Sequence, residues 1–75
     1  MKPPTHAVRD LGQAIKRLRS QRNMTQQQLA DASGLDIRYV GSIERGQRNP
    51  TFGAIQGIAS VFGMKTSDLL RKANL

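Results

Sequence analysis

Hydrophobic residues return every three or four positions from Ala7 to about Arg22, the spacing that gives a helix one buried face. The apolar positions in that segment are Val8, Leu11, Ala14 or Ile15, and Leu18. The same spacing appears in two shorter segments between Thr25 and Gly46 and in a longer one after Thr51. No segment alternates with the period of two that is typical of strands, and no internal repeat is present. We therefore predict an all-α chain of five helices.

Capping residues divide the stretch from Thr25 to Gly46 into two short helices. Thr25 is expected to cap the first, with Gln28 three residues on as its capping-box partner. Gly34 suits the left-handed conformation that ends a helix, and Asp36 is expected to cap the second helix, which Gly46 ends. Two short helices joined by a tight glycine turn are typical of a helix-turn-helix, whose second helix lies in the major groove of DNA. We predict such a unit over residues 25–46.

The segment after this unit predicts two more helices. Thr51 is expected to cap the first of them and Gly63 to end it, with an inward stripe of Phe52, Ile55, Ile58, Ala59 and Phe62. A last short helix is expected after a cap at Thr66 or Ser67, with fraying over residues 71–75.

The length of 75 residues is that of one domain. Residues 1–6 contain adjacent prolines and no periodicity, so we interpret them as a flexible arm. The folded domain is then expected to span residues 7–75.

Composition narrows the class of function. One histidine, no cysteine and five carboxylates offer no convergent set for catalysis or metal binding, so we expect neither an enzyme nor a cofactor. The net charge of +7 favours a polyanionic partner. No apolar run is long enough to cross a bilayer, which predicts a cytoplasmic protein without a membrane partner.

The phrases MTQQQLADASGLD, YVGSIERGQRNPT and TSDLL stand in an order and spacing that resemble a known family. The family is that of the lambda-repressor-like DNA-binding domains, of the type found in Cro and the xenobiotic-response-element regulators. The resemblance covers about Val8 to Leu70. Within it, the wording RYVGSIERGQRN is most similar to the small controller proteins of restriction-modification systems.

The resemblance implies where DNA would be contacted. Residues of the second helix of the unit would reach base edges: Asp36, Ile37, Arg38, Tyr39 and Ser42. Arg38 is the strongest candidate because a guanidinium matches guanine O6 and N7, with a phosphate contact as the alternative. Several family members carry glutamine where Ile37 stands, which leaves Ile37 either an apolar contact with thymine or burial. Tyr39 has three open roles: a thymine methyl, a phosphate, or packing on the first helix of the unit.

Phosphate contacts are expected from residues at the ends of the two helices: Gln26, Arg45, Arg48 and Asn49. Gln26 opens a helix, where free amides and the positive end of the helix dipole attract anions. Family resemblance also implies a structural ion pair between Arg19 and Glu44.

Members of this family usually bind DNA as twofold dimers. The candidates for the dimer surface are Phe62, Met64, Leu69, Leu70 and Leu75. For each of them, burial in the core of the single chain is an equally good interpretation. We therefore expect a bacterial or phage transcriptional regulator, more consistent with a repressor, that binds an inverted-repeat operator as a homodimer and without a small-molecule ligand. Autoregulation, through an operator at its own promoter, is part of this expectation. The alternative is a protein-interaction module, such as an antitoxin or a coactivator-like helix-turn-helix protein.

Overall fold

The structure is a computed structural model that describes residues 5–75. These residues form five helices and no strand. The helices are α1 (Thr5–Gln21), α2 (Gln26–Ser33), α3 (Ile37–Glu44), α4 (Phe52–Val61) and α5 (Thr66–Lys72). The prediction of an all-α, five-helix fold is confirmed.

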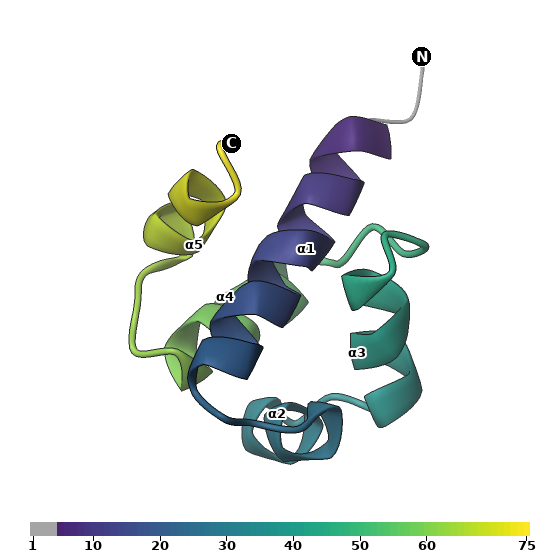
Figure 1. Ribbon diagram of the computed structural model, residues 1–75, viewed down its shortest axis with the longest axis vertical. Coiled ribbons are helices and arrows are strands. Elements are labelled where there is room, and N and C mark those ends of the chain that lie inside the picture. Colours follow the sequence, from purple (N-terminus) through teal and green to yellow (C-terminus); the bar gives the residue numbers. More distant parts are fainter. Residues whose placement is uncertain (1–4) are drawn as a thin grey trace.

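The longest helix, α1, runs along the long axis of the molecule, with α3 on one side and α5 on the other (Figure 1). It packs against both of them, while α2 packs against α3 and α4, and α4 packs against α5. The chain measures 34 × 24 × 20 Å along its principal axes. All five helices contribute to one hydrophobic core, whose fully buried larger side chains are Ile15, Leu29, Val40, Ile43, Ile58 and Leu69.

Three of the predicted helix caps are confirmed. Thr25 Oγ1 accepts a hydrogen bond from the Gln28 amide at 3.0 Å, and Gln28 Oε1 accepts one from the Thr25 amide at 2.8 Å, which completes the capping box. Asp36 Oδ1 accepts from the Arg38 amide at 2.7 Å at the start of α3. Thr51 Oγ1 accepts from the Ala54 amide at 3.1 Å at the start of α4. These side chains satisfy amides that a helix leaves without partners at its first turn.

Three predictions for the first and last helices are wrong: the start of α1, the cap of α5 and the fraying from residue 71. Helix α1 begins at Thr5, so Thr5 and His6 belong to the helix, and residues 1–4 of the predicted arm lie outside the described residues. The cap of α5 is Lys65, because the Asp68 carboxylate reaches back to the Lys65 amide, at 3.2 Å, and starts the helix earlier than predicted. Helix α5 continues to Lys72 and is followed by a buried Ala73, so residues from 71 onward are not simply frayed.

Phe52 was predicted to face inward and is instead 67% exposed. The buried side of α4 runs through Ala54, Ile58 and Phe62, which are spaced four residues apart. Phe52 stands two residues before Ala54, about 200° around the helix, so it faces the opposite way. The cap at Thr51 fixes the helix start and therefore places Phe52 in the exposed first turn.

A glycine in α1 allows a close approach to the end of α3. A Cβ atom on Gly12 would overlap the carbonyl oxygen of Ile43 and would lie 3.1 Å from that of Glu44. Near the same place, Gly46 has a φ of 72°, and a Cβ there would lie 3.1 Å from the Arg9 Cα. Only residues without side chains fit at these two positions, so they fix how α1 crosses the end of α3.

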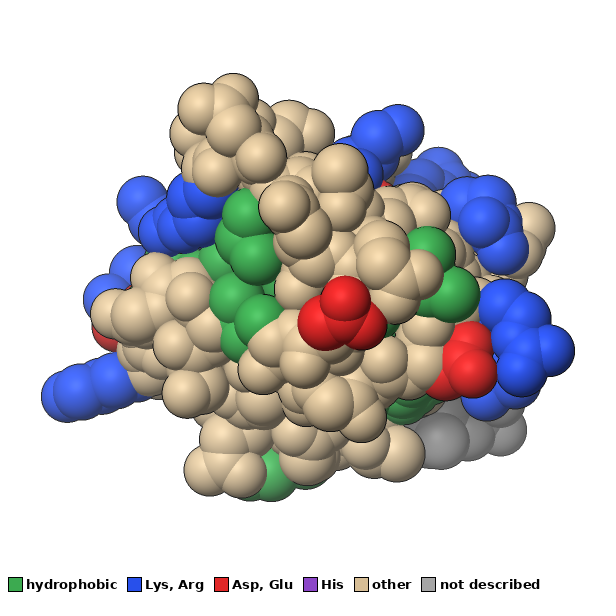
Figure 2. Space-filling model, turned by 90° about the horizontal axis from the view of Figure 1, so that it is seen from below, with side chains coloured by type: hydrophobic (Ala, Val, Ile, Leu, Met, Phe, Trp, Pro, Cys, Tyr) green, Lys and Arg blue, Asp and Glu red, His purple; other side chains and the backbone are tan. Residues whose placement is uncertain are grey.

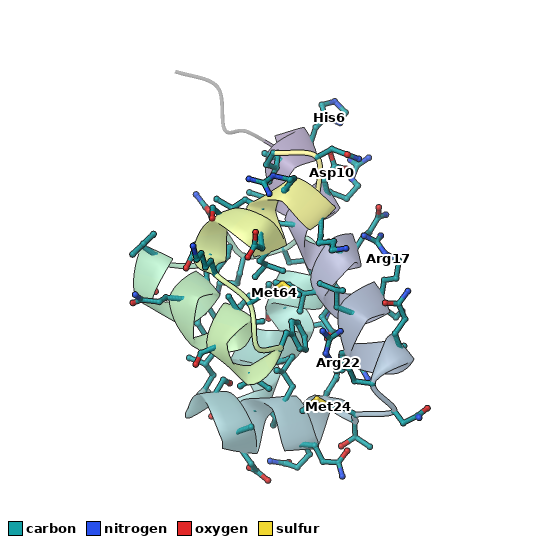
Figure 3. The ribbon with its side chains drawn as sticks, turned by 90° about the vertical axis from the view of Figure 1, so that its left-hand side faces the viewer. His6, Asp10, Arg17, Arg22, Met24 and Met64 are labelled. Atoms are coloured by element: carbon teal, nitrogen blue, oxygen red, sulfur yellow. The ribbon has the colours of Figure 1, made fainter. Side chains whose placement is uncertain are left out.

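Two arginines, one within α1 and one just after it, bind the ends of the last two helices. Arg22 Nη2 donates to the Phe62 carbonyl at 3.2 Å, and its guanidinium lies 4.8 Å from the centroid of the Phe62 ring. Figure 3 labels Arg22 and Arg17 among the side chains. Arg17 Nη2 donates to the Lys72 carbonyl at 3.0 Å. Cationic groups at helix C-termini satisfy carbonyls without partners and interact favourably with the helix dipole.

Within residues 5–75, no helix combines the length and the apolar character that a membrane crossing requires. The same residues bring together no group of three or more His, Cys, Asp or Glu side chains that could hold a metal ion.

Candidate nucleic-acid interface

The turn between α2 and α3 has the geometry of a helix-turn-helix. Gly34 adopts the left-handed conformation, with a φ of 76° and a ψ of 17°, and its amide donates to the Ala30 carbonyl. The Leu35 amide also donates to the Ala30 carbonyl, at 3.0 Å, and Asp36 then caps α3. The predicted unit over residues 25–46 is therefore present, with the start of α3 exposed.

Asp36 and Arg38 form an ion pair at the first turn of α3. Arg38 Nε lies 3.2 Å from Asp36 Oδ1, and Arg38 Nη2 lies 3.3 Å from Asp36 Oδ2. The hydrogen bonds from Arg38 hold the pKa of Asp36 below its ordinary value, and the same carboxylate raises the pKa of Arg38. Both side chains are largely exposed. They lie on the surface that a helix of this kind turns toward DNA.

Ile37 and Ser42, both on α3, differ in how far their side chains are available to a partner. Ile37 is 38% exposed, so it is available for apolar contact and is not buried against α2. Ser42 is half-buried, and its hydroxyl donates to the Arg38 carbonyl at 2.9 Å. Because that proton is used within the helix, Ser42 offers a partner only its lone pairs.

Tyr39 connects α3 to the segment before α4. Its hydroxyl oxygen accepts a hydrogen bond from the Thr51 amide at 3.1 Å, and its half-buried ring packs against the hydrophobic core. The guanidinium of Arg48 lies 5.5 Å from the centroid of the ring. The hydroxyl proton is still available to an acceptor such as a phosphate, because the Thr51 contact uses only a lone pair.

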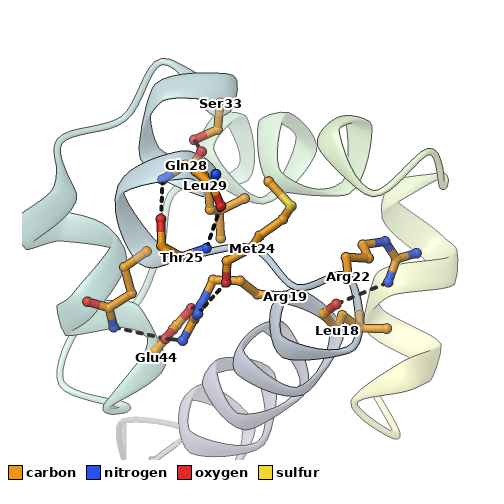
Figure 4. Close-up of polar contacts among 10 residues, drawn as sticks. Leu18, Arg19, Arg22, Met24, Thr25, Gln28, Leu29, Ser33 and Glu44 are labelled. Atoms are coloured by element: carbon orange, nitrogen blue, oxygen red, sulfur yellow. Dashed lines mark hydrogen bonds and ion pairs between the residues drawn. The ribbon is translucent and has the colours of Figure 1, made fainter.

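The carboxylate of Glu44 connects three helices (Figure 4). It accepts from Arg19 Nε at 2.7 Å, from Arg19 Nη2 at 3.0 Å and from Gln26 Nε2 at 3.0 Å. Arg19 Nη1 also donates to the Met24 carbonyl at 2.7 Å. The ion pair predicted from the family resemblance is thus observed, and its hydrogen bonds raise the pKa of Arg19. Among the described residues, no buried side-chain nitrogen or oxygen lacks a hydrogen-bond partner.

Sequence reasoning missed Gly41, which is buried in α3 between two candidate phosphate ligands. A Cβ atom at Gly41 would lie 3.1 Å from Arg45 Nη1 and 3.7 Å from Gln26 Oε1. Arg45 Nε also donates to Gln47 Oε1 at 3.1 Å. A glycine within a helix costs about 1 kcal/mol relative to alanine, and that unfavourable choice was the available signal of a close contact.

The structure brings most of the predicted site residues to one surface. A hollow of about 340 Å³ is lined by Asp36, Arg38, Tyr39, Ser42 and Arg48. Gln26 and Arg45 lie together on the neighbouring side of α3, next to Gly41. Asn49 is exposed in the loop that follows Arg48. Figure 2, which views the molecule from the α2 side, shows Lys and Arg side chains gathered at two opposite flanks, with one acidic group near the middle of the face and others next to the basic groups at the flanks.

Two of the five dimer candidates are excluded by burial. Phe62 and Leu69 are 6% and 0% exposed in the single chain, because they complete the core, so their side chains cannot meet a partner. Met64 and Leu70 are half-buried and pack against the core from outside, and Leu75 is 54% exposed. Leu70 and Leu75 line one hollow on the α5 side, with Ser67, Arg71 and Asn74.

The fold and this surface define a helix-turn-helix protein. Residues 15–69 match the family model described as helix-turn-helix. Control protein C.SmaI of Serratia marcescens is 34% identical over 65 residues, which are 87% of this chain and 77% of the relative. The immunity repressor protein of Bacillus phage phi105 is also 34% identical over 65 residues and 87% of this chain, but this chain spans only 45% of its length.

A solved structure agrees with this assignment. The crystal structure of the restriction-modification controller protein C.AhdI from Aeromonas hydrophila has a TM-score of 0.80 at 37% identity, over 83% of this chain and 94% of that one. The chain therefore belongs to the helix-turn-helix family of transcriptional regulators. The resemblance expected from the sequence is confirmed at this level.

Proposed function

We propose that the chain regulates transcription by binding an inverted-repeat DNA operator as a homodimer. The observation that carries the proposal is the exposed first turn of α3, where Arg38 and Arg48 border one hollow beside a rigidly connected helix-turn-helix. The net charge of +7 favours a polyanion as the partner. The names of the relatives, a control protein and a phage immunity repressor, support regulation as the outcome of binding.

In this proposal α3 lies in the major groove and its exposed side chains meet base edges. Arg38 supplies the strongest discrimination, because its guanidinium donates a pair of hydrogen bonds to guanine, and Ile37 meets a thymine methyl group. Ser42 accepts from a base through its free lone pairs. Asp36 and Tyr39 lie at the edges of this contact.

Phosphates on either side of the groove then meet the ends of α2 and α3. Gln26 stands at the N-terminus of α2, where backbone amides and the helix dipole attract an anion. Arg45, Arg48 and Asn49 lie just beyond α3 and are exposed. These contacts fix the position of the protein on DNA without selecting its sequence.

The dimer is proposed to form through the α5 side, around Leu70 and Leu75. Figure 1 places α5 and α3 on opposite sides of the 24 Å width of the molecule. In a twofold dimer on half-sites about 34 Å apart, each α3 lies about 17 Å from the axis. A twofold axis close to α5 meets that requirement, whereas one close to α3 would bring the two copies of α3 too near each other.

The test is selection of bound duplexes from a random pool at about 150 mM salt, where nonspecific charge binding is weakened. The expected result is enrichment of two inverted half-sites about one helical turn apart. Arg38→Ala should relax one base position in each half-site, whereas Lys65→Ala, an exposed cation at the start of α5, should leave the selected sequence unchanged. If the folded chain enriches no sequence, specific operator binding is excluded.

A further inference from the structure

The guanidinium of Arg38 is held along one edge before any partner binds. Its Nε donates to Asp36 Oδ1 at 3.2 Å and its Nη2 donates to Asp36 Oδ2 at 3.3 Å. The Arg38 amide donates to the same Oδ1 at 2.7 Å. The side chain of Arg38 is nevertheless 89% exposed. Asp36 therefore sets the direction of an otherwise free side chain.

A guanidinium presents two edges that can each donate a pair of hydrogen bonds. The carboxylate of Asp36 engages the edge formed by Nε and Nη2, and Nη1 has no recorded partner among the described residues. The second edge, formed by Nη1 and Nη2, therefore still has N–H groups to donate. Guanine presents two acceptors, O6 and N7, on its major-groove edge, which match such a pair of donors.

The cap at the start of α3 does not require a carboxylate. Asparagine and serine cap helices as well as aspartate does, because the cap needs only one side-chain oxygen. A carboxylate on the surface that faces DNA is also repelled by phosphates. The charge of Asp36 also interacts favourably with the positive end of the α3 dipole, a gain that needs no contact with Arg38. The contact that uses both carboxylate oxygens is the one with Arg38.

We propose that Asp36 is a positioning residue that holds Arg38 in the orientation in which it contacts a guanine, and that it contacts no base itself. The proposal rests on the proposed function, because it specifies one base contact of the operator complex. Oδ1 already accepts two hydrogen bonds and Oδ2 accepts one, so a direct contact from Asp36 to cytosine would compete with the bonds to Arg38.

The experiment compares Asp36→Asn and Arg38→Ala on the selected operator and on duplexes with each base pair of the half-site replaced in turn. Arg38→Ala identifies the guanine, with a loss of discrimination of about 5- to 150-fold at that base pair. Asp36→Asn retains the cap, and we expect it to lower discrimination at the same base pair by about two- to fivefold, the range of exposed ion pairs. Thermal unfolding of each variant controls for folding, and Asp36→Ser is a second variant that retains the cap.

The double variant decides between positioning and direct contact. If Asp36 acts through Arg38, Asp36→Asn has no further effect on discrimination once Arg38 is alanine. A loss at a different base pair that persists in the Arg38→Ala background overturns the proposal, as does an equal gain in affinity for every duplex. If the wild-type chain selects no duplex, the proposed function itself fails. That outcome differs from failure of the positioning role, in which wild type still selects an operator and only the variants give unexpected results.

Discussion

Glu44 and Arg19 form a pair of hydrogen bonds in which both side chains are withdrawn from solvent, with exposed fractions of 2% and 12%. Gln26 donates to the same carboxylate. Removing one partner of such a pair leaves a buried charge without compensation, which costs about 3–5 kcal/mol when the charge is fully desolvated.

We therefore expect Glu44→Gln and Arg19→Gln each to lower the free energy of unfolding by a few kcal/mol, about 3–5 at most. The double variant should lose less than the sum of the two, with a coupling of about 1–3 kcal/mol. Urea unfolding of the four proteins measures this cycle. Additive losses would mean that the two side chains do not stabilise the fold through each other.

Gly12 provides a test of how α1 crosses α3. Gly12→Ala introduces a methyl group that overlaps the Ile43 carbonyl oxygen, and the neighbouring atoms are backbone that cannot rotate away. We expect a loss of about 1–3 kcal/mol in unfolding free energy, although alanine favours helix more than glycine does. Gln13→Ala, at an exposed position beside it, should change stability by less than about 0.5 kcal/mol. Equal stability of Gly12→Ala and wild type would contradict the observed helix crossing.

The lowered pKa of Asp36 leads to a specific prediction for how the stability of the fold depends on pH. Arg38 holds the pKa of Asp36 below its ordinary value in the folded chain, so at acid pH the unfolded chain takes up a proton there more readily than the folded one. The stabilisation is complete above the unfolded pKa of about 3.9 and is lost as pH falls through the lower folded pKa.

Thermal unfolding of wild type and Asp36→Asn should therefore differ by a constant amount above about pH 5 and converge in more acid solution. In the Arg38→Ala background the pH-dependent part of this difference should be smaller, because the hydrogen bonds from the side chain of Arg38 are the largest cause of the lowered pKa. A difference that stays constant across the acid range would show that the pair does not influence Asp36.

Leu70 and Leu75 test the proposed dimer surface. Leu75→Asp places a charge on an exposed side chain beside α5, so we expect dissociation of the dimer with little loss of monomer stability. Leu70→Asp should have a larger effect on both, because Leu70 is half-buried. Phe52→Ser is the matched control, since Phe52 is exposed at the start of α4. Sedimentation equilibrium measures the outcome, and a folded Leu75→Asp protein that remains a dimer would exclude this surface.

The local features of the fold were accessible from the sequence because they depend on neighbouring residues. Thr25 and Gln28 are three residues apart, and Asp36 and Thr51 each bind an amide of the next turn, so capping rules were sufficient. The orientation of Phe52 required the exact phase of α4, which packing against the other helices determines. Periodicity likewise did not determine whether Phe62 and Leu69 face the core or a partner. A helix face buried in the core and one buried against a partner show the same apolar stripe.

The candidate site shows the same division. The resemblance to a known family was sufficient to predict the pair of Arg19 and Glu44. It did not predict that Gly41 lies against Arg45, or that the Thr51 amide donates to the Tyr39 hydroxyl. Those contacts join residues that are brought together by side-chain rotamers and by the path of the loop after α3. Neither property follows from the spacing of hydrophobic residues.

The carboxylate that joins α1, α2 and α3 also has a consequence for how an encounter with DNA would proceed. Glu44 connects Gln26, at the start of α2, to the end of α3. The distance between the proposed phosphate contact and the proposed base-contacting surface is therefore set before a duplex arrives. Little backbone entropy is then lost on association, and ordering is confined to exposed side chains such as Arg48. In the proposed complex the unit would therefore meet DNA as a rigid template, and any deformation that the fit requires would fall on the duplex.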